Sequence, residues 1–209
     1  MYSTISGYTG SCSVYSVLLS SFSSLILPGL LFIGSAKVSS LKVKCDLDDV
    51  FKIMNQKLRN GGLLLTTAGK ENSTNVMTIG WCLAGVLWGE PICMVAIRPS
   101  RHTFKLIEES GEFTVNTPKD GMEEAVAYCG KVSGRDYDKF KESKLATEKG
   151  RMVKSPMVTD CVAHLECRVI GKSKVVPDLL TAGVKEKAYP NGDYHTLYYG
   201  RLISVLRDK

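Results

Sequence analysis

The residues best suited to chemistry lie in two short segments of this sequence. The first, Asn75-Val-Met-Thr-Ile-Gly-Trp81, places an amide, a hydroxyl and a large aromatic ring in a single run. The second, Arg98-Pro-Ser-Arg-His-Thr103, gathers cationic and hydroxyl side chains just before a run with helical character. Together they would suit a flat, hydrogen-bonding ligand that carries a phosphate. Taken alone, each segment is more typical of a half-buried strand or of an ordinary helix cap.

Residues that could hold the phosphate surround the predicted start of this helix. Ser100 has the residue type and position of an N-cap, and the first-turn amides beyond it would point outward with a partial positive charge. Arg101 and the hydroxyls of Ser100 and Thr103 would complete an anion cradle. The alternative is that Ser100 only caps the helix and that Arg101 is solvated.

A second helix start with nearby cations is predicted at Ser133. Ser133 and Asp136 have the spacing of a capping box. Lys131, Arg135 and Lys139 lie around them in the sequence. Ordinary capping beside surface charge would also explain this pattern. Two cation-rich helix starts in one domain nevertheless favour an anionic ligand more than one does.

Three further side chains could contact the ring of such a ligand. Trp81 could stack on a planar ring or belong to the core, and Asn75 could pair with the polar edge of a heterocycle or turn the chain. His195 follows the turn signal Asn191-Gly-Asp193 and could contact a ligand edge or be structural. No Ser-His-Asp, Cys-His or paired-carboxylate arrangement can be argued. We therefore expect no catalytic side chain, as in proteins whose cofactor performs the chemistry.

Length and composition suit one globular domain. The chain has 209 residues, a formal net charge of +6 and 44% hydrophobic residues, enough to bury a core without disulfides. Its lysines are scattered and form no basic block with interleaved aromatic residues, so nucleic-acid binding is not expected. An anionic small ligand would also benefit from the positive charge.

The cysteines indicate reduced thiols rather than a metal site or disulfides. There are seven, an odd number, and no Cys-x-x-Cys occurs. Cys161 and Cys167 are six positions apart, a poor match to zinc-site spacing. Several others lie in apolar runs, where cysteine behaves as a small hydrophobe. We expect no metal and a cytoplasmic protein.

The first 36 residues differ from the rest, with no Asp, Glu, Lys or Arg and ten serines. They could form a signal peptide, although a charged n-region is missing, or a membrane anchor, although the serines and Pro28-Gly29 weaken a spanning helix. They could also be an extension outside the fold. We expect the last, with residues 1–42 as the extension and residues 43–209 as the domain. Export, anchoring or membrane contact would require that this segment is retained.

Strand-like runs bounded by Gly, Pro, Asn and Asp dominate the domain, as in an antiparallel sheet. The predicted strands are residues 63–68, 76–84, 92–97, 113–116, 162–170 and 196–206. A first helix is predicted from the helical spacing of Val50, Ile53, Met54 and Leu58, with Asp46 or Asp48 as its cap and Asn60-Gly-Gly62 as its end. The other predicted helices are residues 102–110, 122–128 and 135–142. Few strands precede a crossover helix, and no G-x-G-x-x-G or P-loop occurs. The sequence therefore predicts a mainly β fold, a small antiparallel barrel with short peripheral helices.

Five segments, in order and with familiar spacing, resemble the flavin reductase-like family, and within it the flavoredoxin branch. They are Asn75-Val-Met-Thr-Ile-Gly-Trp81, Ile97-Arg-Pro-Ser-Arg-His-Thr103, Gly111-Glu-Phe-Thr-Val-Asn116, Tyr128-Cys-Gly-Lys-Val-Ser-Gly-Arg-Asp-Tyr-Asp-Lys-Phe140 and Leu165-Glu-Cys167. The resemblance spans residues 47–205. Each motif is modest alone, but five in sequence are specific.

The resemblance implies a split β-barrel that binds FMN, usually as a homodimer with the flavin near the subunit interface. It also implies an oxidoreductase that uses NADH or NADPH, or a partner protein, as electron donor. Two alternatives remain: an electron-transfer FMN carrier without nicotinamide activity, and a binding barrel without redox chemistry.

The resemblance also assigns cofactor-binding residues by motif position. Those expected along the isoalloxazine ring are Asn75, Thr78 and Trp81. Those expected at the ribityl phosphate are Ser100, Arg101 and Thr103. Further residues expected near the flavin, or in the signature loop beside it, are Ser133, Lys139 and His195.

Two departures from the family pattern bear on these assignments. His102 stands where tyrosine is common, which leaves the phosphate contacts intact. Tyr194-His-Thr196 and Gly200-Arg201 replace the usual His-Asp and Gly-Glu pattern near the last strand, which weakens the assignment of His195 more than the others.

Overall fold

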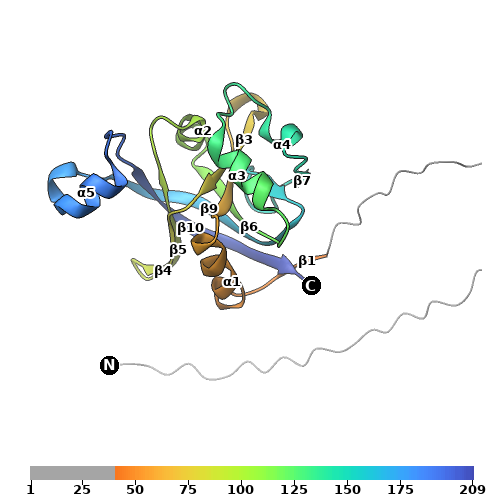
Figure 1. Cartoon of the computed structure of the whole chain (residues 1–209). Helices are drawn as coiled ribbons and strands as arrows, with labels where there is room; N and C mark the ends of the chain where they lie inside the picture. Colours follow the sequence, from red (N-terminus) through yellow and green to blue (C-terminus); the bar gives the residue numbers. More distant parts are fainter. Residues whose placement is uncertain (1–40) are drawn as a thin grey trace, which may run out of the picture. The chain divides into compact units, whose positions relative to one another are not determined.

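The computed structural model describes residues 41–209, which fold around one curved antiparallel sheet. The strands are β1 Lys42–Lys44, β2 Leu63–Ala68, β3 Thr74–Ile79, β4 Cys82–Leu87, β5 Glu90–Ile97, β6 Glu112–Pro118, β7 Thr147–Glu148, β8 Met157–Val158, β9 Cys161–Lys174 and β10 Thr196–Asp208. The helices are α1 Leu47–Arg59, α2 His102–Ser110, α3 Glu123–Lys131, α4 Lys139–Glu142 and α5 Ala182–Ala188. Figure 1 shows their arrangement.

The sheet forms a split barrel, as predicted. Its order is β3-β2-β6-β9-β10-β5-β4, with β1 paired to the end of β10, while β7 and β8 form a separate pair. The two outer strands of this order, β3 and β4, are consecutive in the chain. The bond from the Ala96 amide to the Trp81 carbonyl, 3.3 Å long, continues the β4–β5 ladder by one residue pair beyond Cys82 and Val95. Strand β3 also contacts β5, which brings the two ends of the sheet together.

The barrel interior is filled by apolar residues that alternate along the strands. Phe113 and Val115 on β6 and Ala163, Leu165 and Cys167 on β9 face inward and are at most 1% exposed. Their spacing of two follows from the alternation of side chains across a strand. Burial of each large side chain contributes about 1.5–3 kcal/mol.

Gly200 allows β10 to pass close to this core. The β9–β10 register shifts between Tyr199 and Gly200. A Cβ atom at Gly200 would lie 2.5 Å from Phe113 Cζ and 2.8 Å from Cys167 Cβ. Only glycine permits this approach of backbone to core side chains.

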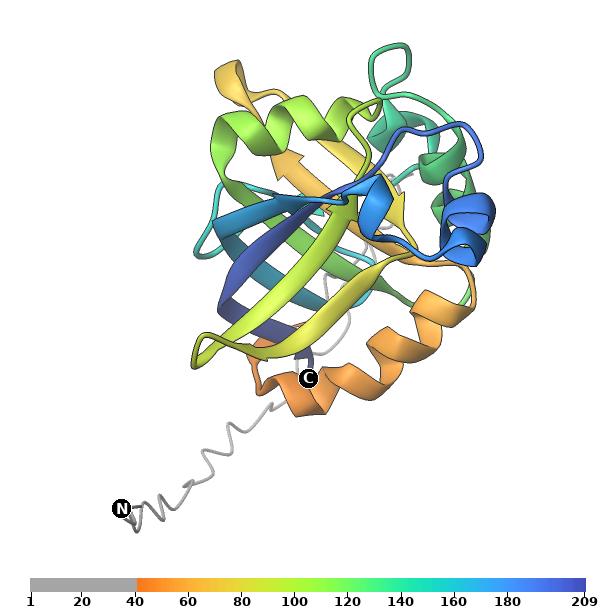
Figure 2. The ribbon, with the colours of Figure 1, turned by 90° about the vertical axis from the view of Figure 1, so that its left-hand side faces the viewer.

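Helices α1 and α2 lie at opposite ends of the barrel, as Figure 2 shows. Val50 and Met54, four residues apart on α1, are buried against the barrel. The Asp49 carboxylate accepts the Asp46 amide at 3.1 Å, the reciprocal half of a capping box. Helix α2 ends at Gly111, whose left-handed φ of 64° suits glycine. Both helices were predicted, and the bounds of α2 are those expected.

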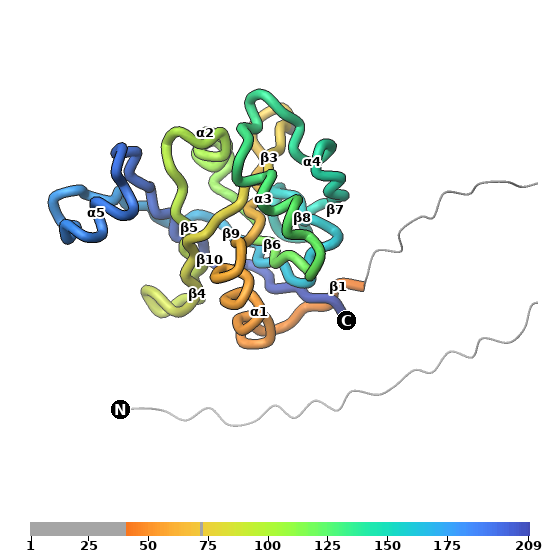
Figure 3. Tube along the Cα trace, viewed as in Figure 1, coloured from red at the N-terminus to blue at the C-terminus, as the bar shows by residue number. Residues whose placement is uncertain are grey.

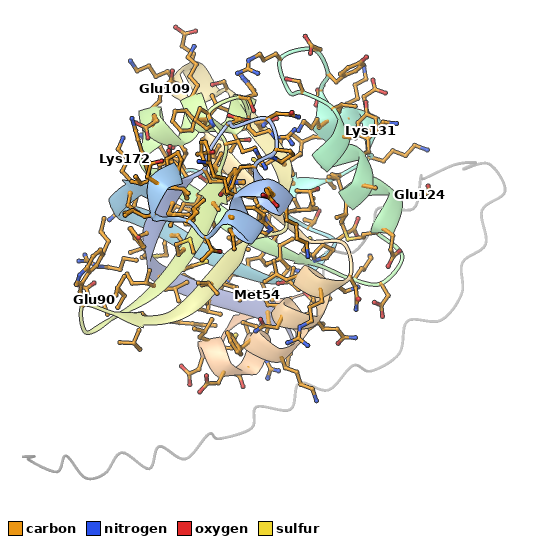
Figure 4. The ribbon with its side chains drawn as sticks, turned by 60° about the vertical axis from the view of Figure 1, so that its left-hand side comes forward. Met54, Glu90, Glu109, Glu124, Lys131 and Lys172 are labelled. Atoms are coloured by element: carbon orange, nitrogen blue, oxygen red, sulfur yellow. The ribbon has the colours of Figure 1, made fainter. Side chains whose placement is uncertain are left out.

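Helices α3 and α4 cover the outer face of β2 and β3. A second apolar cluster joins them to the sheet through Leu64, Val76, Val126 and Cys129. The tube in Figure 3 shows this layer beside β3. Figure 4 shows Glu124 and Lys131 of α3 on its solvent side.

The structure corrects the strand predicted over residues 76–84. Strand β3 ends at Ile79, and the chain passes through Gly80 and Trp81 before β4 begins. The prediction that Trp81 lies within a strand is therefore wrong. The apolar run continues through the break, so its composition does not reveal the turn.

Two predicted helices also have different bounds. Helix α3 continues through Gly130 to Lys131, so this glycine does not end it. Of the helix predicted over residues 135–142, only α4 is helical, and Asp138 caps it by accepting the Lys141 amide at 3.1 Å. Helix α5 was not predicted, because it has no buried residue and hence no apolar face to reveal it.

Other sequence predictions concern membranes, metals and thiols. Within residues 41–209, no helix combines the length and apolar character needed to cross a bilayer. In the same part of the chain, no group of three or more His, Cys, Asp or Glu is placed to hold a metal ion. The described cysteines are free thiols, with Cys82 Sγ and Cys93 Sγ 3.5 Å apart in the core. Most of the extension expected over residues 1–42 lies outside the described residues.

Candidate functional site

Two adjoining cavities lie beside β3 and the segment that leads into α2, and residues between 129 and 139 line the first of them. The first, which we name the cationic cavity, has a volume of about 420 Å³. The second, the aromatic cavity, has about 540 Å³ and is lined by Trp81 and His195. Met77 and Arg101 line both cavities. A single elongated ligand can therefore extend from one to the other.

Three cations line the cationic cavity, and none of them forms an ion pair with a carboxylate of the described residues. Their hydrogen bonds within this part of the chain go to backbone carbonyls: Arg101 Nη1 to Gly130 at 3.5 Å, Arg135 Nη1 to Ser100 at 2.9 Å and Lys139 Nζ to Cys129 at 2.8 Å. Converging positive charges without a counter-charge favour the binding of an anion.

Lys139 is the most buried of these three cations. It lies at the start of α4 and is 4% exposed. Burial lowers its pKa from 10.5 to about 8, the neighbouring Cys129 opposes this change, and Arg101 adds to it. A bound anion would offset the cost of holding this charge away from water.

The prediction that Ser100 caps the helix is wrong, because α2 begins at His102 with Arg101 as its N-cap. The Ser100 hydroxyl instead donates to Asp193 Oδ2 at 2.6 Å, and its amide lies 3.4 Å from Asp193 Oδ1. A carboxylate thus occupies donors that were expected to hold a phosphate. Thr103 lies in the first turn of α2 and is fully buried.

Asn75 lines the cationic cavity rather than the aromatic cavity. Its side-chain amide donates to Thr103 Oγ1 at 2.7 Å. Gly134 packs against it so closely that a Cβ atom there would lie 2.1 Å from Asn75 Oδ1. The absence of a side chain at Gly134 therefore lets the loop approach β3.

The capping box predicted at Ser133 is also wrong, because no helix begins there. The Ser133 hydroxyl accepts the Arg135 amide at 3.2 Å within a loop. The contact of Gly134 with β3 holds this loop in place of a helical turn, and the loop carries Arg135 to the cavity. Arg101, Arg135 and Lys139 thus line one cavity together with Ser133, whereas Lys131 does not line it.

The aromatic cavity is lined by residues of β3, of the β3–β4 connection, of the end of β5 and of the segment before β10. Trp81 is 45% exposed, so it is not a core residue, and its ring lies 4.4 Å from that of His195 at an angle of 43°. The Thr78 hydroxyl donates to the Val126 carbonyl, a bond that fastens α3 to β3. Thr78 therefore lines this cavity with a hydroxyl whose proton is engaged.

Arg98 fixes the segment that precedes His195, a role that the sequence did not reveal. Its guanidinium donates to three carbonyls, those of Ala188 at 2.8 Å, Gly192 at 3.2 Å and Asp193 at 2.9 Å. It also stands 5.2 Å from the centroid of the Tyr189 ring. One side chain therefore holds the end of α5 and the turn before β10. The only sequence signal for this role was that Arg98 belongs to the second of the two segments described first.

His195 is buried beside Trp81 and makes one side-chain hydrogen bond within the described residues, between Nδ1 and the Tyr189 hydroxyl at 2.9 Å. Burial lowers its pKa from 6.5 to about 4, and Arg98 acts in the same direction against the opposing carboxylate of Asp193. The imidazole is therefore neutral at neutral pH. Tyr189 was missed because it precedes the turn and lies outside every recognised motif.

Known proteins are similar to this chain over most of its described residues. The family model described as "Flavin reductase like domain" matches residues 56–209. An uncharacterised protein of Archaeoglobus fulgidus is 33% identical over 141 residues, which cover 68% of this chain and 69% of the relative.

Two solved structures show similar folds. An FMN-binding domain of a flavin reductases-like enzyme from Shewanella baltica superposes with a TM-score of 0.59 at 20% identity, over 82% of this chain and 79% of its own. A flavoredoxin from Methanosarcina acetivorans gives a TM-score of 0.55 at 27% identity, over 71% of this chain and 69% of its own. At 20% identity the first likeness shows the fold alone.

Proposed function

Because this chain belongs to the flavin reductase-like family, we propose that it is an FMN-binding oxidoreductase that takes electrons from NADH, NADPH or a partner protein. The observation that carries the proposal is the pair of adjoining cavities, one lined by unpaired cations and the other by aromatic rings. A flavin mononucleotide has the matching two parts, a flat ring and a phosphate.

The donor set fits this cofactor. Arg101, Arg135 and Lys139 are cations that lack carboxylate partners in the described part of the chain, as a site for a dianionic phosphate requires. Trp81 offers a half-exposed ring face beside them. We assign the phosphate to the cationic cavity, where Thr103, Asn75 and Ser133 complete the wall.

The chain's own residues would position the cofactor and control water. Bound FMN supplies the acceptor for a hydride or for single electrons. Trp81 and His195 wall the ring site, and Thr78 fastens the adjacent strand to α3. Lys139 and Arg101 hold charge at the phosphate end, where it anchors the cofactor without entering the chemistry.

A second copy of the chain would complete the aromatic cavity. Strand β4, at the edge of the sheet, and the turn that follows it expose Leu83 by 68%, Val86 by 79% and Trp88 by 64%. Figure 2 shows β4 and β5 crossing the front of the barrel without a helix over them. Trp81, at the start of the same hairpin, joins this apolar edge to the cavity. Apolar patches of this kind mark interfaces, and we propose a homodimer.

The direct test is a titration of the purified protein with FMN, followed by flavin fluorescence. We expect saturable binding in wild type and binding weaker by about tenfold to a hundredfold in Arg101→Ala, because charge-assisted hydrogen bonds are lost. Arg168→Ala is the matched control, since Arg168 pairs with Glu112 away from both cavities. A colourless protein that does not quench added FMN refutes the proposal.

The electron donor is tested separately under anaerobic conditions. Rapid bleaching of the bound flavin by NADH or NADPH identifies a nicotinamide-dependent reductase. Reduction only by a reduced carrier protein identifies an electron-transfer FMN protein. No residue of the two cavities distinguishes these donors.

A further inference from the structure

The side chain of Tyr189 contacts His195 at the wall of the aromatic cavity. We infer that Tyr189 holds His195 in the tautomer that carries its proton on Nε2, so that the imidazole offers a fixed N–H donor to this cavity. Tyr189 is then a positioning residue that acts through His195. The value of such a donor for a flavin rests on the proposed function, whereas the tautomer itself does not.

The direction of the hydrogen bond follows from the contacts of the phenol. The Tyr189 oxygen lies 2.9 Å from His195 Nδ1, a distance that allows donation either way. If Nδ1–H donated to this oxygen, the phenol proton would have no acceptor among the described residues. A buried donor without an acceptor is costly, so the phenol donates to Nδ1.

The place of the phenol is fixed by its neighbours. Tyr189 is 6% exposed, and its amide donates to the Lys185 carbonyl at 2.9 Å, which ends α5. Its ring lies 4.6 Å from the ring of Tyr194 and 5.9 Å from that of Trp81. The Arg98 guanidinium stands over the Tyr189 ring as well. The Tyr189 hydroxyl therefore has little freedom to turn away from His195.

The charge state of both rings agrees with this arrangement. Burial raises the pKa of the Tyr189 phenol, which therefore keeps its proton. Burial and Arg98 lower the pKa of His195 to about 4, so a neutral imidazole with a single proton is present near pH 7. Since Nδ1 accepts from Tyr189, that proton lies on Nε2.

His164 provides an internal reference of the opposite kind. Its Nδ1 lies 2.8 Å from Asn116 Oδ1. The Asn116 amide nitrogen donates to the Leu64 carbonyl at 3.1 Å, which fixes Oδ1 as the acceptor facing His164. An amide oxygen cannot donate, so His164 carries its proton on Nδ1. The two histidines are thus predicted to be opposite tautomers in one protein.

A neutral donor at this place suits a ring that gains negative charge on reduction. It would stabilise the reduced form without adding a fixed positive charge to the oxidised form. A mixture of tautomers would present a lone pair to the cavity in a fraction of the molecules. By donating its own proton to Nδ1, the Tyr189 hydroxyl keeps the imidazole proton on Nε2. This is the role that we assign to Tyr189.

The test is long-range ¹H–¹⁵N correlation spectroscopy of the full chain labelled at its three histidines, without added flavin. In wild type we expect His195 as the Nε2–H tautomer and His164 as the Nδ1–H tautomer. Tyr189→Phe should convert His195 to a mixture and leave His164 unchanged. Tyr194→Phe is the matched control, because its ring stacks on Tyr189 but its hydroxyl makes no hydrogen bond within the described residues.

Two outcomes overturn the inference: His195 as the Nδ1–H tautomer in wild type, or an unchanged His195 spectrum in Tyr189→Phe. The wild-type measurement stands even if the variant does not fold. With FMN added, Tyr189→Phe should lower the ratio of reduced-to-oxidised flavin affinity by roughly threefold to tenfold, as the loss of one hydrogen bond predicts. If wild type shows the expected tautomer but binds no FMN, the proposed function fails and the tautomer assignment survives.

Discussion

Keeping Lys139 charged costs free energy because its ammonium group is buried, whereas the lysines of the surface are solvated. Its residue type and its place after Asp138 were visible in the sequence, but its burial was not. Burial depends on the carbonyl of Cys129 and on the fold of the preceding loop. The sequence thus predicted the chemical type of a site residue such as Lys139. The structure revealed its burial and its hydrogen bond, which the sequence did not show.

Flavin binding should weaken as pH rises through about 8. Lys139 is charged below this pKa and neutral above it, and an anion binds the charged form. The affinity for FMN is therefore expected to be full near pH 7 and to fall by up to about tenfold per pH unit above 8. Fluorescence titrations between pH 7 and 9.5 measure this dependence.

Lys139→Gln should bind FMN more weakly at pH 7 and lose the decline above pH 8. Lys131→Gln, on the solvent side of α3, is the control and should keep the wild-type profile. A wild-type affinity that stays constant up to pH 9.5 contradicts the assignment of the phosphate to Lys139.

The contact between Ser100 and Asp193 shows what residue-level reasoning could not reach. The two residues are 93 positions apart, and no local pattern joins them. The cradle at Ser100 was predicted from the neighbourhood of a helix start alone. In the structure, Arg101 and Thr103 line the cationic cavity, whereas the Ser100 hydroxyl donates to the carboxylate of Asp193.

At the level of elements, prediction succeeded where local signals and tertiary packing agree. Strand β2 and helix α2 have the predicted bounds, because apolar residues and a terminal glycine mark them. The loop at Ser133 was predicted to start a helix, and its contact with Asn75 through Gly134 overrides that preference. Helix α5 has no apolar face, so periodicity could not reveal it.

Strand β10 depends on Gly200 for its path across the core. Gly200→Ala should lower the free energy of unfolding by about 1–3 kcal/mol, because the added methyl group meets the fully buried Phe113. Urea unfolding followed by circular dichroism measures the change. Gly85→Ala, in a strand position with no atom within 4 Å of the added Cβ, should change stability little. Equal losses in the two variants would contradict this account of β10.

For the whole molecule, the sequence was sufficient to predict a mainly β barrel, and the order of strands came only with the structure. Strands β9 and β10 pair across the turn and helix between them, and β10 also pairs with β5 and β1. Such long-range pairing leaves no trace in local composition. The exposed hairpin was likewise invisible, because its apolar residues read as an ordinary strand.

The proposed homodimer makes a prediction for the assembled protein. Leu83→Glu should convert the dimer to a monomer, because a charge would be buried at the apolar face of β4. Leu179→Glu is the control and should remain dimeric, because Leu179 is 82% exposed and lies outside β4 and its hairpin. Analytical ultracentrifugation measures both, and a wild-type monomer would remove the basis for a shared cavity.

The stability of the fold should depend on the buried His164. Burial lowers its pKa to about 3, whereas the unfolded chain titrates near 6.5. Between these values the unfolded state binds the extra proton, so the free energy of unfolding is full above pH 6.5 and falls as pH decreases toward 3. The contribution is at most about 1.4 kcal/mol per pH unit.

His164→Gln should therefore reduce the slope of unfolding free energy against pH between 4 and 6. His102→Gln is the control, because His102 is only partly buried, whereas His164 is fully buried. Denaturant titrations at several pH values provide the slopes. Identical slopes in wild type and His164→Gln would contradict this origin of acid sensitivity.

The bond from the Ala96 amide to the Trp81 carbonyl has a consequence for hydrogen exchange. This bond ends the β4–β5 ladder beside the aromatic cavity, so the amide proton exchanges with deuterium at the rate at which this end of the β4–β5 pair opens. Both residues also line the aromatic cavity. A ligand held there would oppose this local opening and slow the exchange of this amide, while amides in the core of β9 would exchange as before. Ligand occupancy of the cavity can thus be followed through the exchange rate of the Ala96 amide proton, without any signal from the ligand.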